Sequence, residues 1–256
     1  MLFSLGSVTT VVRILEAMDR QDELLEQEDG RYFAIDKFGT GLASVATSER
    51  LGRKKTIVVS FGLPSGPALF LHLAYRAFSQ VRRVDPQGLF DMHPQGRWPD
   101  RQGPLFDYLE NCMAHAVFSF TAIEAFANEV IPDAFTYTLQ REGKKETLLK
   151  PDIERRINLD EKLDKVLPAA LSVSSPKNKK VWEEYRAIKR IRNRLIHLKS
   201  VDRKLSGPED ETIWGALLKA HGEAWCDSAH AMIGHFKPAV HNRRWYGKYP
   251  FEIAKP

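Results

Sequence analysis

The sequence predicts a mainly α-helical protein: a bundle of four long helices behind a mixed α/β N-terminal extension. From residue 105 to 238, apolar residues recur at helical spacing, and the connections between segments are short. Residues 1–104 instead place a β-branched stretch among helical ones. No apolar run of about 18 residues occurs, so we expect no membrane contact and no membrane span.

The first 104 residues alternate between helix and strand signals. Residues 7–27 have the spacing of a helix, residues 54–62 (KKTIVVSFG) have the β-branched density of a strand, and residues 66–84 again favour a helix. Residues 85–104 are rich in Pro, Gly and Asp, which is typical of a linker. We therefore expect residues 1–104 to form an N-terminal extension, whose role the sequence does not indicate.

From residue 105 onward we expect helices alone. A helix ending at Pro132 is apolar almost all round between Cys112 and Phe126, which predicts a central, buried position. Three further helices are expected: one from Pro151 to about Pro168, either continuous or broken at Asn158, one at 181–200, and one long final helix at 208–238. The two cysteines, Cys112 and Cys226, cannot form a disulfide framework, so we expect a cytoplasmic protein.

Positive charge is concentrated in one segment of the chain. Between Lys177 and Lys204, eleven Lys or Arg residues face three acids, a local net charge of +8 in a chain whose total is +5. The remainder is therefore slightly acidic. Such a segment suggests an anionic partner, nucleic acid before membrane, although a simply solvated helix face would look the same.

The helix expected at 181–200 divides into two faces. At 100° per residue, an apolar face comprises Val181, Tyr185, Ile188 and Leu195, with Ile191 and Leu198 beside them. A second stripe is wholly polar and comprises Arg186, Arg190, Asn193 and His197. We expect the first face to lie in the core and the second to face solvent or a ligand.

Arg192 falls inside the apolar face of this helix. Unpaired burial of its guanidinium would cost several kcal/mol, so it needs a partner or a route to the surface. Glu124 lies in the apolar helix SFTAIEAFAN and needs a partner for the same reason. We expect Glu124 to pair with Arg192, or with a neighbouring Asn or Arg; the alternative is a solvated Glu124 at the helix rim.

His197 lies among arginines near the end of the helix, an arrangement suited to phosphodiester cleavage. A histidine can accept the proton of a ribose 2′-hydroxyl, and an arginine can neutralise charge that builds on the phosphate oxygens. On an ideal helix Arg192 and His197 point about 140° apart. A two-fold partner, or local unwinding near residue 197, would be needed to bring both to one phosphate.

The stretch RNRLIH, containing Arg192, Asn193 and His197, resembles the R-x4-6-H motif of HEPN domains (higher eukaryotes and prokaryotes nucleotide-binding). FSFTAIEAFANEVIP resembles the earlier family helix that carries an acidic residue, and INLDEKLDKVLP resembles the segment between the two. The resemblance covers roughly residues 105–238 and leaves 1–104 aside.

The resemblance implies a four- to five-helix bundle that forms a homodimer and cleaves RNA without metal or other cofactor, leaving a 2′,3′-cyclic phosphate. It implies a catalytic role for Arg192, Asn193 and His197 and a supporting role for Glu124. We expect the neighbouring cations to bind RNA, namely Arg186, Arg190, Arg194 and Lys199. Many members of the family are toxins or phage-defence effectors, so an antitoxin or regulatory protein is a further expected partner.

Other interpretations stay open on the sequence alone. The chain can be a non-catalytic HEPN module that binds RNA, nucleotide or a partner protein, or a helical scaffold whose basic helix is only solvated. Residues 239–256 form a basic and aromatic tail that either stacks on RNA bases or packs on the protein. Cys226 and His230 have the spacing of two metal ligands, but two ligands do not make a site, so we expect both side chains to pack in the protein.

Overall fold

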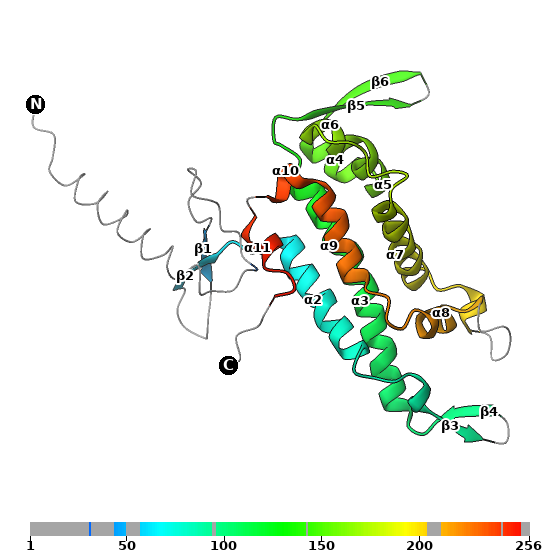
Figure 1. Ribbon diagram of the computed structural model, residues 1–256. Helices are drawn as coiled ribbons and strands as arrows, with labels where there is room; N and C mark the ends of the chain where they lie inside the picture. Colours follow the sequence, from blue (N-terminus) through cyan, green and yellow to red (C-terminus); the bar gives the residue numbers. More distant parts are fainter. Residues whose placement is uncertain are drawn as a thin grey trace, which may run out of the picture.

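Helix α3 (Gln102–Glu129) is the central element, as its apolar composition predicts (Figure 1). The computed structural model describes residues 31, 44–49, 57–93, 96–141, 143–203, 211–241 and 243–251. Within these ranges the main contacts of α3 are with α2 (Gly66–Val81), α7 (Lys180–Ile196), α8 (Ile213–Lys219) and α9 (Trp225–His235). The mainly helical fold is confirmed. None of the described helices combines the length and the apolar character needed to cross a membrane.

Helix α2 begins where the sequence predicts. The side chain of Ser65 accepts a hydrogen bond from the Ala68 N–H at 3.4 Å, and a proline occupies the first turn. Ala68 and Leu71 are fully buried in the same core as α3. This part of the predicted N-terminal extension therefore packs in the bundle, while the division at residue 104 stays a prediction. The helix expected at 7–27 lies outside the described residues.

Two antiparallel hairpins lie in the N-terminal half of the chain. Strand β1 (Ser44–Glu49) pairs with β2 (Ile57–Gly62), which confirms the strand predicted at 54–62. Strand β3 (Phe90–His93) pairs with β4 (Gly96–Pro99), after a short 3-10 turn at Gln87–Leu89. The segment predicted as a linker therefore carries regular structure.

A third hairpin corrects the expectation of helices alone after residue 105. Strand β5 (Thr136–Arg141) pairs with β6 (Lys144–Leu149), and the turn between them contains Gly143 at φ +76°. A positive φ favours glycine, because it has no Cβ to clash with the backbone. Leu139 and Leu148 are the buried side chains of this hairpin. The alternation of polar and apolar residues here has the period of a strand and not of a helix.

The segment after the hairpin forms short helices: α4 (Lys150–Arg156), α5 (Leu159–Glu161), a π-helical turn (Lys162–Val166) and α6 (Leu167–Leu171). The single continuous helix is wrong, and the alternative with a break at Asn158 is confirmed, because the Asn158 side chain caps α5 by accepting the Glu161 N–H at 2.9 Å. The π-helical turn carries Lys162, which is buried. Its Nζ donates to Asn128 Oδ1 and to the Glu154 carbonyl, both at 2.7 Å, and thereby ties this segment to α3.

The single long helix predicted at 208–238 is wrong. The structure has α8 and α9 with a turn between them, and Gly222 in that turn has φ +89°. A residue with a side chain would be strained there, so the chain reverses where the glycine permits it. Thr212 caps α8 by accepting the Gly215 N–H at 3.0 Å. Residues 204–210 lie outside the described ranges.

A buried histidine caps the start of α9. His115 of α3 lies between Phe78 and Trp225, with ring centroids at 4.8 and 5.1 Å. Its Nε2 accepts the Cys226 N–H at 3.0 Å, which satisfies one of the free donors at this helix end. Burial lowers the pKa of His115 to about 3, so the ring is neutral and able to accept.

The described part of the C-terminal tail packs on the protein. The tail contains the short helices α10 (Lys237–Val240) and α11 (Arg244–Gly247). The ring of His230, on α9, stacks with Tyr246 of α11 and with Tyr249, at ring-centroid distances of 4.2 and 4.4 Å. Trp245 and Phe251 are buried. The packing interpretation of the tail is confirmed for residues 243–251. The same stacking accounts for His230 without a metal.

Candidate functional site

Helix α7 carries the predicted motif and presents two faces, as expected. The buried side chains on it are Trp182, Tyr185, Ile188 and Leu195. Val181 and Ile191 are partly buried against the same core. Leu198, which was expected beside this face, is 43% exposed because α7 ends two residues earlier, at Ile196. The apolar face therefore stops one turn short of the predicted length.

The polar stripe of α7 faces outward. Arg186, Arg190 and His197 are exposed, and Asn193 is partly buried. The stripe runs toward the end of α7 that lies near α8 (Figure 1). Cationic and imidazole groups are thus available to a ligand along one side of the helix.

Arg192 lies against an aromatic ring and not against a carboxylate. Its guanidinium carbon is 4.8 Å from the ring centroid of Phe120, a residue of α3. Its Nη1 donates to Asn193 Oδ1 at 3.1 Å. The expected ion pair with Glu124 is wrong: both residues are described, and no ion pair joins them. A guanidinium over an aromatic face gains about 0.5–2 kcal/mol, which explains how Arg192 tolerates a partly buried position.

Glu124 lies one turn after Phe120 on α3 and is partly buried. The negative charge of Glu124 acts to raise the pKa of Lys162 and the pKa of Tyr185. Burial lowers the pKa of Lys162, and the negative charges of Glu124 and Glu154 oppose that shift. Glu124 thus interacts electrostatically with the buried Lys162, and the supporting role of Glu124 stays a prediction.

His197 is the residue at which α7 ends. Its backbone N–H donates to the Asn193 carbonyl at 3.0 Å, but its dihedral angles, φ −121° and ψ 67°, are no longer helical. The side chain is exposed. Among the described residues, no hydrogen bond, ion pair or ring contact joins this imidazole to Arg192, Asn193 or Glu124. The chain thus brings Arg192 and Asn193 together and leaves the His197 side chain without a contact to either.

Arg194 was expected to bind RNA, but its guanidinium is already engaged. It donates to both carboxylate oxygens of Asp202, at 2.7 and 3.3 Å, and to the Glu211 carbonyl. Asp202 is buried and also accepts the backbone N–H groups of Lys199 and Ile213. Arg194 therefore holds the chain that follows α7, and its predicted contact with RNA stays a prediction.

The four hydrogen bonds to Asp202 stabilise its charged form. The hydrogen bond from Arg194 is the largest contribution and, with the two backbone N–H donors, lowers the pKa of Asp202 to about 2. The backbone carbonyl of Asp202 also accepts Trp214 Nε1–H at 2.9 Å. This cluster joins the end of α7 to the start of α8 and so fixes where His197 emerges.

A second acid organises the middle of α7. Asp160 accepts the Tyr185 hydroxyl and Lys189 Nζ, each at 2.5 Å. Burial alone would raise the pKa of Asp160, but these two hydrogen bonds and the charge of Arg186 hold it below its ordinary value. Arg186, Arg190 and Lys199 remain exposed, so the prediction that they bind RNA stays open.

Sequence reasoning missed Phe120, Asp160 and Asp202. A signal existed for Asp202, because it is the acid that follows a helix end crowded with arginines. Phe120 lies four residues before Glu124 and faces the same direction on α3, so it was an equally placed neighbour for Arg192. Helical spacing alone does not distinguish the ring of Phe120 from the carboxylate of Glu124 as the partner of Arg192.

In the part of the chain that the structure describes, no group of three or more His, Cys, Asp or Glu side chains could hold a metal ion. No protein-family model, no curated protein and no solved structure matches this chain.

Proposed function

We propose that the chain is a metal-independent endoribonuclease of the HEPN type that acts as a homodimer in the cytoplasm. The observation that supports this most is the end of α7. There, Arg192 is held over Phe120 and hydrogen-bonded to Asn193, and an exposed His197 follows at the point where the helix ends. The exposed cations Arg186 and Arg190 continue from this end along the helix.

The proposed reaction uses these groups as follows. His197 accepts the proton of a ribose 2′-hydroxyl, and the 2′-oxygen forms a bond to phosphorus. The bond from phosphorus to the 5′-oxygen breaks, leaving a 2′,3′-cyclic phosphate. The departing 5′-oxygen takes a proton from His197 of the partner subunit. Arg192 neutralises the charge that grows on the phosphate oxygens, and Asn193 orients Arg192 through their hydrogen bond.

A second candidate is a non-catalytic HEPN module that binds RNA, nucleotide or a partner protein. The separation of His197 from Arg192 and Asn193 within one protomer favours it. This module would use the same cations to hold a phosphate without cutting the chain. The two candidates share a binding surface and differ in the product.

The test is cleavage of a labelled RNA in EDTA by the wild type and by His197→Ala. We expect loss of at least about 100-fold in rate, because general acid–base catalysis contributes 10²–10⁴-fold. The products of the wild type should carry 2′,3′-cyclic phosphate and 5′-hydroxyl ends. His221→Ala is the matched control, since His221 is exposed and the one hydrogen bond described for its imidazole joins it to Tyr108.

Circular dichroism must show that both variants are folded. Equal cleavage by the wild type and His197→Ala would remove the nuclease proposal. Binding of RNA without any cyclic-phosphate product, lost in Arg192→Ala, would favour the second candidate.

A further inference from the structure

A second feature of the molecule is a pocket of about 530 Å³ between α2 and α3, the two helices that lie side by side in Figure 1. This volume lies in the range that holds small organic molecules. Ala77 of α2 and Ala114 of α3 line the pocket, and their short side chains leave room between the helices. We call it the α2–α3 pocket.

One end of the α2–α3 pocket is aromatic. Its lining there comprises Tyr75 of α2, Phe118 of α3 and Phe251 of the C-terminal tail. Phe118 stacks with Phe70 at a centroid distance of 6.2 Å, and Phe251 meets His72 edge-on at 5.7 Å. These contacts hold the two rings near the N-terminal half of α2. Aromatic walls of this kind favour a flat ring as the ligand, bound by stacked or edge-to-face contacts.

The other end of the α2–α3 pocket is cationic. Arg83 lies just after the C-terminal end of α2, and Arg76 lies two turns earlier, between Arg83 and the aromatic end. Both arginines are exposed. On α3, which runs in the opposite direction, Asn111 lines this end about 10 Å along the helix axis from Phe118. The pocket therefore has an aromatic end and a cationic end within the length of a small molecule.

The two arginines of this pocket have no counter-charge in the described structure. Arg83 Nη1 donates only to Gln80 Oε1, a neutral atom at 3.5 Å, and Arg76 makes no hydrogen bond or ion pair there. None of the described lining residues is an Asp or a Glu. An arginine without a carboxylate keeps its charge and its fork of N–H donors, which match the oxygens of a carboxylate or phosphate.

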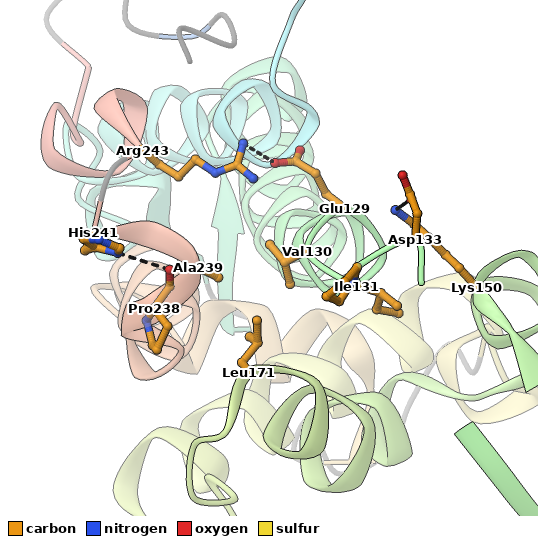
Figure 2. A pocket seen from close by; sticks show the side chains of 11 residues that line it. Glu129, Val130, Ile131, Asp133, Lys150, Leu171, Pro238, Ala239, His241 and Arg243 are labelled. Carbon is orange, nitrogen blue, oxygen red and sulfur yellow. Dashed lines mark hydrogen bonds and ion pairs between the residues drawn. The ribbon is translucent and has the colours of Figure 1, made fainter. Parts of the chain in front are cut away.

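The pocket at the C-terminal end of α3 differs in this respect (Figure 2). There, Lys150 Nζ pairs with Asp133 at 2.8 Å. Arg243 Nη1 lies 3.5 Å from Glu129 Oε1. An anion entering that pocket would compete with two carboxylates of the protein, whereas an anion in the α2–α3 pocket meets arginines that are not neutralised.

We infer that the α2–α3 pocket binds a small aromatic anion, a flat ring that carries a carboxylate or a phosphate. The ring packs among Tyr75, Phe118 and Phe251, and the anionic group lies between Arg76 and Arg83. No residue of α7 lines this pocket among the described ones, so the site is separate from the one proposed to cut RNA.

The test is isothermal titration calorimetry of the full chain with three probes. 2-Naphthoate and 2-naphthyl phosphate distinguish a carboxylate from a phosphate ligand, and 2-naphthamide is their neutral counterpart. We expect at least one anion to bind and the amide to bind at least about tenfold more weakly. Affinity for the anion should fall as the salt concentration rises, because salt screens exposed charges.

Variants locate the site. Arg76→Gln and Arg83→Gln should each weaken anion binding about tenfold and leave binding of the amide unchanged. Phe118→Leu removes the ring but keeps an apolar side chain, and should weaken binding of all three probes. Arg82→Gln is the matched control, because Arg82 is exposed beside Arg83 but lies over the Phe78 ring and does not line the pocket.

Unchanged anion binding in both Arg76→Gln and Arg83→Gln, with thermal melting showing folded protein, would overturn the inference. An equal loss in Arg82→Gln would overturn it as well, because the effect would then be one of general surface charge. Equal affinity for the amide and the anions, or no binding of either anion at millimolar concentration, has the same consequence. RNA cleavage is measured separately, so failure here leaves the α7 proposal standing.

Discussion

Arg192 and Arg194 lie two residues apart on α7, yet their surroundings differ. Arg192 faces α3, where it lies over Phe120 and bonds to the Asn193 amide. Arg194 faces the chain that follows α7, where the buried Asp202 accepts two of its N–H groups. One guanidinium meets no acid among the described residues, and the other is neutralised.

This difference separates binding from support. A guanidinium that is fully matched to a buried carboxylate has little left to offer a phosphate. A guanidinium over an aromatic ring keeps its charge and several donors. The comparison predicts that Arg194 and Asp202 act on stability, and that Arg192 acts on function.

The largest expected effect is on stability, at Asp202. Asp202→Asn should lower the free energy of unfolding by about 3–5 kcal/mol, because Arg194 would lose its buried counter-charge. The measurement is urea denaturation followed by circular dichroism. Asp152→Asn is the control: Asp152 pairs with Arg155 on the surface, and such pairs contribute about 0–1 kcal/mol. Similar losses in the two variants would contradict the role given to Asp202.

The second prediction is that a change at Arg192 affects activity much more than stability. Arg192→Ala should reduce RNA cleavage about 100-fold, since loss of one group that stabilises transition-state charge costs roughly that much. Its unfolding free energy should fall by only about 0.5–2 kcal/mol, the contribution of its contact with Phe120. Arg192→Lys should restore part of the activity. Full activity in Arg192→Ala would place the two arginines in the same, purely structural class.

A third test extends the comparison to histidines. His115 is buried with a pKa of about 3, below its ordinary value of 6.5. The unfolded chain therefore binds a proton that the folded chain refuses, and stability falls as pH drops below the ordinary value. His115→Gln keeps an acceptor for the Cys226 N–H and should flatten this part of the stability profile, measured by thermal melting across pH. An unchanged slope would contradict a buried, neutral His115.

The smallest expected effect concerns the exposed cations of α7. Arg186→Gln and Arg190→Gln should each weaken RNA binding modestly and lower the slope of log affinity against log salt by about 0.7 per lost phosphate contact. Lys219→Gln, on α8, is the control for a cation outside the stripe. If Lys219→Gln lowers this slope as much as the two arginine variants do, the polar stripe of α7 is not the RNA-binding surface.

The sequence predicted the helices whose signals are local. The apolar run in α3, the proline at the start of α2 and the break at Asn158 each depend on neighbours within one turn. The errors came where a single residue changed the local conformation. Gly222 adopts a positive φ where one long helix was expected, and Gly143 does so in a hairpin within a segment to which no strand had been assigned.

The candidate site shows the same division. The alternation of apolar and polar faces on α7 follows from helical periodicity, so the sequence by itself determined which side chains face out. The partners of Arg192, Arg194 and Glu124 come from other segments of the chain. Only the packing of α3 and of the loop after α7 decided that Arg192 meets a ring and Arg194 meets an acid, because long-range contacts depend on how whole elements pack and not on local spacing.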